Sequence, residues 1–217
     1  MSHPKINIEK VFQYACKNGH LDVAQQMLLI KPNIDISAGN EEAFRIACSN
    51  GHLNIVHWLL EVKPTINISA YDEEAFRWAC QYGHFNIAEW LLFVKPTINI
   101  SAQNEYAFRW ACFNGHLNIA QLLIQIKPTI DISAQDEDAF RSACFGGYLN
   151  IAKWLLFIKP TINISAKNDD AFQTACSKGC LTIAKWLLEI KPTIDISAQN
   201  EYAFKWSCYR GHLNVAQ

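Results

Sequence analysis

Residues 39–70 read GNEEAFRIACSNGHLNIVHWLLEVKPTINISA, and this stretch decides the fold. Asn40 is a preferred helix N-cap, and the two glutamates after it suit the positive end of a helix dipole. Phe44 and the Ala-Cys pair that ends at Cys48 are spaced i, i+3 and i+4, which gives one apolar helix face. Gly51 provides the left-handed residue that ends many helices. The first half of the stretch therefore predicts a helix that closes at Gly51.

A second helix is expected directly after this turn. Pro64 ends it, since the residue before a proline avoids helical geometry. Ile66, Asn67 and Ile68 then alternate as a short extended arm would. The stretch predicts a helix–turn–helix–arm unit, which cannot bury its apolar faces alone. The residues expected on the inner side of the second helix are Leu53, Val56, Leu59 and Leu60.

The same unit recurs along the chain with a period of 32 residues. Seven of the eight cysteines follow this period, at positions 16, 48, 80, 112, 144, 176 and 208. A strict period of this length indicates stacked supersecondary units. We expect an all-α repeat solenoid with short extended arms, a single array over residues 1–217. Its repeats are expected at residues 1–38, 39–70, 71–102, 103–134, 135–166, 167–198 and 199–217.

The two ends of the array differ from its middle. Pro4 to Phe12 spans eight residues where Pro32 to Phe44 spans twelve, a shortening that is typical of an N-terminal cap. The last repeat, 199–217, stops before the W-L-L segment that would complete its second helix. We expect a fragment or a truncated reading frame. The alternative is an open end that stacks on another chain.

The pattern A-C-x-x-G-H-L-x-I-A-x-x-L-L resembles the ankyrin repeat, whose core reads A-A-x-x-G-H-x-x-I-V-x-x-L-L. Two features depart from it. Ala43-Phe44-Arg45 replaces the T-P-L-H opening, so the threonine–histidine hydrogen bond of the family cannot form, and Lys-Pro-Thr-Ile replaces its Gly-Ala-Asp loop. The sequence pattern N-E-Y-A-F-R…I-K-P-T-I-N-I-S-A is similar to that of ankyrin arrays in giant DNA viruses that infect amoebae. The resemblance implies a non-enzymatic interaction module whose first helices and turns line a concave groove.

Composition and charge limit the classes of partner. With 19 basic and 20 acidic residues, the chain lacks the basic excess that attracts nucleic acid or an anionic membrane surface. Its apolar runs are too short to span a bilayer, and its start carries no secretory signal. Equivalent cysteines of stacked repeats lie too far apart for disulfides, and unpaired thiols indicate a reducing compartment. We expect the cytoplasm, which is the host cytoplasm for a viral protein, with the nucleus as an alternative.

The recurrent C-x-x-x-H pairs, such as Cys48 and His52, resemble metal or catalytic motifs. Zinc needs four converging ligands, and the histidine series breaks at Tyr148 and Cys180. Nucleophilic catalysis needs one asymmetric constellation, whereas this pair is repeated. We expect buried thiols, turn-bonding histidines, no metal site, no cofactor and no catalytic residue.

Three further rows of side chains are interpreted as architecture. Arg45 stands four residues after Glu41, and Arg77, Arg109 and Arg141 have the same spacing from a glutamate, which predicts i,i+4 ion pairs in four repeats, with a phosphate track as the alternative. Asn67 opens an N-I-S sequon, but other repeats carry Asp there, so a short acceptor in a turn is expected. A tryptophan recurs in the second helices and is expected to pack between repeats or, alternatively, to contact a ligand. Its positions are Trp58, Trp90, Trp154 and Trp186.

Positions that vary between repeats are the candidates for partner contact, since stacking does not dictate them. Aromatic residues gather at such positions in the third to fifth repeats, and exposed aromatic clusters are the usual anchors of protein interfaces. The alternative is that these rings pack on one another and stiffen the stack. The predicted partner-binding residues are Tyr71, Trp78, Tyr82, Tyr106, Trp110, Phe113 and Phe145.

The sequence thus predicts a monomer that binds a partner protein, in a viral setting a host protein, through a rigid groove with aromatic anchors. The second hypothesis is a structural array that self-associates through its C-terminal end.

Overall fold

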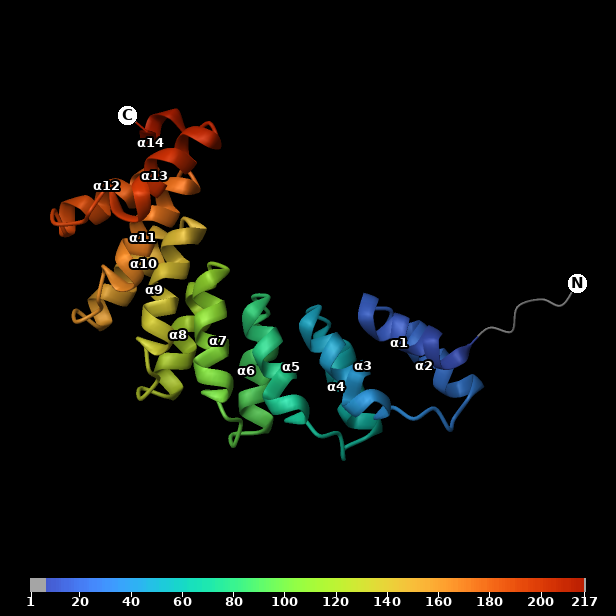
Figure 1. Ribbon diagram of the computed structural model, residues 1–217. Coiled ribbons are helices and arrows are strands. Elements are labelled where there is room, and N and C mark those ends of the chain that lie inside the picture. Colours follow the sequence, from blue (N-terminus) through green and yellow to red (C-terminus); the bar gives the residue numbers. More distant parts are fainter. Residues whose placement is uncertain (1–6, 217) are drawn as a thin grey trace, which may run out of the picture. The chain divides into compact units, whose positions relative to one another are not determined.

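The computed structural model describes residues 7–216, which form fourteen helices (Figure 1). The expected short arm at Pro4 lies outside the described residues, as does Gln217. Contacts divide the chain into an N-terminal part, residues 1–102, and a C-terminal part, residues 103–217, and each is described by itself. The first six helices are α1 Ile8–Asn18, α2 Leu21–Ile30, α3 Ala38–Ser49, α4 Leu53–Val62, α5 Ala70–Gln81 and α6 Phe85–Val94. The others are α7 Ala102–Phe113, α8 Leu117–Ile126, α9 Ala134–Gly146, α10 Leu149–Ile158, α11 Ala166–Ser177, α12 Leu181–Ile190, α13 Ala198–Tyr209 and α14 Leu213–Ala216.

The helices recur in pairs, so that odd-numbered helices are the first and even-numbered helices the second of each repeat. In the repeat that begins at residue 39, Gly51 forms the turn between them with a φ of +82°, as predicted. The second helix, α4, ends at Val62, directly before Lys63-Pro64. Residues 7–216 contain no strand. The expected all-α repeat fold is therefore confirmed.

The core of each repeat is built on the phenylalanine of its first helix. Five of these side chains are at most 1% exposed, and burying each contributes about 1.5–3 kcal/mol. Three of the recurrent tryptophans lie against these phenylalanines from the next repeat, as expected. Ring centroids lie 6.3 Å apart in each of the pairs Phe12–Trp58, Phe108–Trp154 and Phe140–Trp186.

The inner face of the second helix differs in part from the prediction. Val56 and Leu59 are fully buried, as expected. Ile55 is also fully buried, whereas Leu53 and Leu60 are only half-buried. The helix is thus turned slightly about its axis relative to the face that the sequence suggested.

Each repeat from residue 39 onward contains a left-handed turn of three residues near the start of its first helix. The φ angles of these residues lie between 52° and 65°, at positions 39–41, 71–73, 103–105, 135–137, 167–169 and 199–201. Asn40 belongs to such a turn, so the prediction that it caps the helix is wrong. Left-handed geometry costs about 1–2 kcal/mol per non-glycine residue. Other contacts must offset this cost in every repeat.

In four repeats an arginine of the first helix closes this turn. In Arg141, Nε donates to the carbonyl oxygen of Asp136 at 2.8 Å and Nη2 donates to that of Gln135 at 3.3 Å. Its Nη1 lies 2.7 Å from Oδ2 of Asp170 in the next repeat. Arg45 likewise pairs with Glu74 of the next repeat. The predicted i,i+4 pair of Arg45 with Glu41 is therefore wrong, because the left-handed turn places Glu41 elsewhere.

In five of the six turns the third residue is a buried carboxylate, which binds the arm at the end of the same repeat. Glu137 is 8% exposed. Its Oε1 accepts the backbone N–H of Asn163 at 3.1 Å, and its Oε2 accepts the hydroxyl of Ser133 at 2.6 Å. Lys159 donates to the same serine hydroxyl at 2.5 Å. Glu41 and Glu73 accept the equivalent backbone N–H groups. This network joins adjacent repeats where the family's T-P-L-H opening is missing.

The arms between repeats consist of two consecutive turns. Ile66 N–H donates to the carbonyl of Lys63, and Ala70 N–H donates to that of Asn67. The side-chain oxygen of Asn67 accepts the N–H of Ser69 at 3.1 Å, and Asp131 does the same for Ser133 at 3.0 Å. The prediction of a short acceptor in a turn is confirmed.

Candidate partner-binding face

Three aromatic side chains form a ridge along α7. Tyr106, Trp110 and Phe113 are spaced i, i+4 and i+7 and therefore share one helix face. The ring centroid of Trp110 lies 5.6 Å from that of Tyr106 and 4.9 Å from that of Phe113. All three side chains are half-buried. The ridge combines fixed ring positions with access to solvent.

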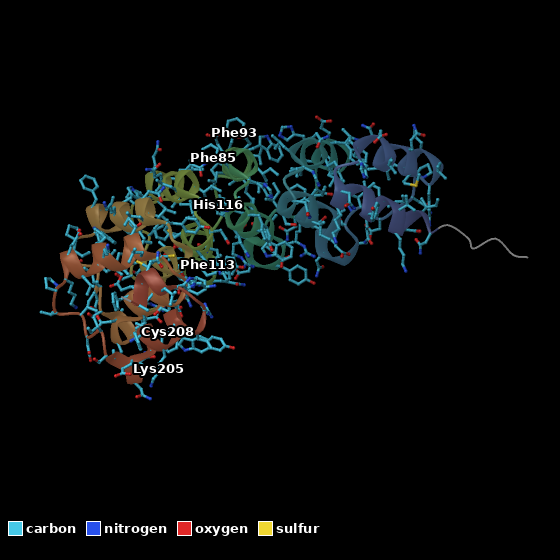
Figure 2. The ribbon with its side chains drawn as sticks, turned by 90° about the horizontal axis from the view of Figure 1, so that it is seen from above. Phe85, Phe93, Phe113, His116, Lys205 and Cys208 are labelled. Carbon is cyan, nitrogen blue, oxygen red and sulfur yellow. The ribbon has the colours of Figure 1, made fainter. Side chains whose placement is uncertain are left out.

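The ridge continues onto α9 through Phe145. This ring stacks on Phe113 with centroids 5.7 Å apart and an interplanar angle of 22°. On its other side, Nζ of Lys178 lies 4.3 Å from the ring centroid of Phe145. A shallow cavity of about 160 Å³ lies beside the two phenylalanines, with further lining from Arg141, Ser142, Asp170 and Thr174. Four predicted residues, Tyr106, Trp110, Phe113 and Phe145, are thus brought together in the C-terminal part (Phe113 is labelled in Figure 2).

The other three predicted residues lie in the N-terminal part, spread along α5. Tyr71 is in the left-handed turn at its start, 55% exposed, with the guanidinium carbon of Arg45 4.5 Å from its ring centroid. Trp78 is half-buried in the middle of the helix. Tyr82 is the C-cap residue and is 53% exposed. Tyr71 and Tyr82 therefore stand at opposite ends of one helix and form no single cluster.

Sequence reasoning missed a second aromatic ridge on α13. Tyr202, Trp206 and Tyr209 occupy the same repeat positions as Tyr106, Trp110 and Phe113. Their successive ring centroids lie 5.7 and 5.4 Å apart, and Tyr209 is 82% exposed. The guanidinium carbon of Arg210 lies 5.2 Å from the ring centroid of Trp206. The segment N-E-Y-A-F, which occurs at residues 104–108 and again at 200–204, could have revealed this ridge.

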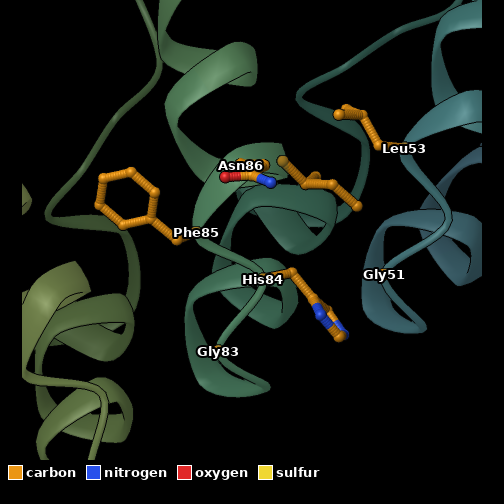
Figure 3. A pocket seen from close by; sticks show the side chains of 7 residues that line it. Gly51, Leu53, Gly83, His84, Phe85 and Asn86 are labelled. Carbon is orange, nitrogen blue, oxygen red and sulfur yellow. The ribbon is translucent and has the colours of Figure 1, made fainter.

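The recurrent histidines and glycines join the turns of neighbouring repeats. Nε2 of His84 lies 2.9 Å from the carbonyl oxygen of Ser49, and Nε2 of His52 lies 2.9 Å from that of Lys17. Figure 3 shows His84 reaching toward the turn at Gly51. A Cβ at Gly51 would lie 2.7 Å from this ring, so the position has no room for a side chain. The prediction of turn-bonding histidines is confirmed for these two residues.

The thiols of the first helices belong to the core. Cys48, Cys80 and Cys112 are fully buried, and desolvation raises their pKa values. Burial raises the pKa of Cys16 to about 12. Such thiols are poor nucleophiles and poor metal ligands, because both roles need the thiolate. In residues 7–216 no group of three or more His, Cys, Asp or Glu side chains is arranged to hold a metal ion.

A family model of ankyrin repeats, built from three copies, matches residues 12–104 and 76–168. No curated protein matches the chain. Among residues 7–216, every helix is too short or too polar to cross a bilayer.

Proposed function

The chain belongs to the ankyrin-repeat family, and from this premise we propose that it is a non-enzymatic protein that binds a partner protein through the aromatic side chains of its first helices. Ankyrin repeats are generally protein-interaction modules. The observation that carries the proposal is the joined cluster of Trp110, Phe113 and Phe145, because repeat stacking requires none of these rings. The equivalent positions carry Ile46, Ser49 and Ser177 in other repeats.

The cluster suits partner binding for two physical reasons. Its rings are fixed by mutual contacts, so little side-chain entropy is lost when a partner binds. Large aromatic side chains that are accessible and already ordered supply most of the energy in many protein interfaces. Tyr71, Trp78 and Tyr82 extend the proposed partner-binding set to the N-terminal part.

We further propose the setting that the sequence resemblance implies. The protein acts as a monomeric scaffold in the cytoplasm of an amoebal host, and its partner is a host protein. The resemblance of the N-E-Y-A-F-R repeats to viral ankyrin arrays supports this setting.

The proposal is tested by pull-down from amoebal lysate with the wild-type chain and the Trp110→Ala/Phe113→Ala/Phe145→Ala variant, whose folding is checked by circular dichroism. Phe93→Ala/Phe157→Ala is the matched control, because these phenylalanines are 80% and 82% exposed on second helices (Phe93 is labelled in Figure 2). We expect a protein that the wild type and the control retain and the triple variant loses. Identical capture by the folded triple variant would show that the cluster only stiffens the stack.

A second candidate function is self-association through the surface at α13. Phe204 is 54% exposed, whereas the equivalent residues from Phe12 to Phe172 are at most 6% exposed. Phe204 also borders an apolar cavity of about 280 Å³ together with Phe172, Leu188 and Ile196. A repeat from a second copy of the chain would cover this surface. Light scattering should then give a mass that rises with concentration for the wild type and stays monomeric for Phe204→Asp.

A further inference from the structure

We propose that the segment bound by the C-terminal part is an acidic peptide with aromatic or aliphatic anchors. This inference rests on the proposed function and names the chemistry of its partner. Its basis is the pair of cations, Lys178 and Arg210, that stand beside the aromatic rings of the first helices.

These two cations differ from the arginines Arg109 and Arg141 of the first helices. Arg109 and Arg141 are neutralised by Asp138 and Asp170, with N–O distances of 2.6 and 2.7 Å. Within residues 7–216, neither Lys178 nor Arg210 forms an ion pair with a carboxylate. Both are exposed. Their positive charge is therefore available to a partner.

Both cations are held in place by aromatic rings. Lys178 lies over Phe145, and Arg210 lies over Trp206 while its Nη1 donates to the carbonyl oxygen of Ser177 at 3.1 Å. A cation against a ring face loses water on one side and strengthens its interaction with an incoming carboxylate. An acidic group that pairs with Lys178 would also bring its neighbouring residue to the edge of the Phe145 ring, beside the shallow cavity.

Helix capping alone does not explain the two cations. Basic residues near a helix C-terminus interact favourably with the helix dipole. However, the equivalent position carries Asn18, Asn50, Tyr82, Asn114 and Gly146 in the other repeats. A cation is thus not needed to end the helix, and its presence in two successive repeats calls for another role.

The space between the two aromatic ridges fits one peptide segment. The ridges on α7 and α13 are three repeats apart, roughly 25–30 Å if each step between packed helices is 8–10 Å. Between them α9 and α11 present the short side chains Ser142 and Thr174. A helix with its side chains is about 10–12 Å wide. One helical or extended segment can lie over these short residues and reach both ridges and both cations.

A single-stranded nucleic acid would also place negative charge near cations and bases near aromatic rings. The net charge of −1 argues against it, because a phosphate backbone is attracted by a basic excess that the chain lacks. A peptide with spaced carboxylates needs only the two cations, whereas a backbone with one charge per nucleotide needs a longer basic track.

The test is selection of a random dodecamer peptide display library on the whole chain, followed by affinity measurements on synthetic copies of the enriched peptides. We expect enrichment of Asp and Glu together with Phe, Tyr, Trp or Leu. Raising the salt concentration should weaken binding several-fold, because charge pairs at a surface are screened. Lys178→Glu/Arg210→Glu should weaken it by about tenfold or more.

The matched control is Lys153→Glu/Lys185→Glu, which changes the net charge equally and also spans adjacent repeats, but on the second helices. It should bind within about twofold of the wild type. Enriched peptides that need Trp110 and Phe113 but are neutral or basic would overturn the acidic preference and leave the proposed function standing. Failure to enrich any peptide that depends on these rings would count against both. Displacement of bound peptide by a dodecamer of single-stranded thymidylate at equal concentration would favour nucleic acid and overturn the inference.

Discussion

The guanidinium of Arg109 donates to the carboxylate of Asp138, 29 residues later, at 2.6 Å. The same carboxylate lies 3.3 Å from Nη2 of Arg141 in its own repeat. Arg141 in turn pairs with Asp170, so the ion pairs form a continuous chain across three repeats. Asp138 is the only member of this chain that contacts two arginines among the described residues.

The chain of ion pairs predicts unequal costs for two similar substitutions. Asp138→Asn should lower the free energy of unfolding by about 1 kcal/mol, and Asp170→Asn by about half as much, because only the first removes the charge partner of two guanidinium groups. Urea denaturation measures both values. Asp22→Asn, at an exposed position of α2, is the control and should change little. Equal effects of the three substitutions would contradict the ordering.

The left-handed turns predict that glycine stabilises the fold at their positions, although glycine within a helix is usually destabilising. Gln135 has a φ of 59°, and Gly39 occupies the same position in another repeat. Gln135→Gly should raise the free energy of unfolding by up to about 1 kcal/mol, because glycine adopts this geometry without steric cost. Gln121→Gly, within α8, should lower it by about 1 kcal/mol. Thermal unfolding of the two variants gives the sign of each change in stability. A loss of stability in both would argue against the left-handed turn at Gln135.

The buried carboxylate of Glu137, at the end of the turn 135–137, is expected to matter more than the exposed charges. Glu137→Ala should cost about 2–3 kcal/mol, since the N–H of Asn163 and the hydroxyl of Ser133 lose their acceptor. Ser133→Ala removes one of these bonds and should cost less. Hydrogen exchange at Asn163 offers a direct local measurement. Unchanged protection of that amide in Glu137→Ala would contradict the bridging role.

The thiols predict a loss of stability in alkali. The pKa of Cys16 is about 12 in the folded chain and about 9 when the thiol is solvated. Between these values the unfolded chain releases a proton that the folded chain keeps, so the free energy of unfolding falls as the pH rises. Each buried thiol contributes a slope of up to about 1.4 kcal/mol per pH unit. Urea denaturation between pH 8 and 10 should give a shallower decline for Cys16→Ala than for the wild type.

Much of the fold could be predicted because its determinants are local. Gly51 and Pro64 bound the helices, and the period of the cysteines gives the repeat. The left-handed turn could not be predicted, because residues such as Tyr71 and Lys167 have no intrinsic preference for positive φ. Their geometry depends on contacts with residues farther along the chain, namely the side chain that closes the turn, Arg77 or Gln173, and the arm at the end of the same repeat. The partner of Arg45 was missed for the same reason, since it belongs to the following repeat.

The candidate site was predictable in composition and only partly in arrangement. Variation of residue type between repeats, at the positions of Trp110 and Phe113, identified the ridge on α7. The proposed role of Lys178 depends on its contact with the ring of Phe145 in the preceding repeat, and the sequence alone does not predict this contact. The ridge that contains Trp206 was missed because it lies in the last repeat, outside the third to fifth repeats in which most of the variable aromatic residues gather.

The bond between Glu137 and the Asn163 amide also has a mechanical consequence. It fastens the arm at the end of one repeat to the turn that opens the same repeat, so tension on the chain must break it before the next stretch can unravel. Under a steady pull, each rupture would release one period of 32 residues, roughly 110 Å of contour length. The molecule would then extend in steps of equal length.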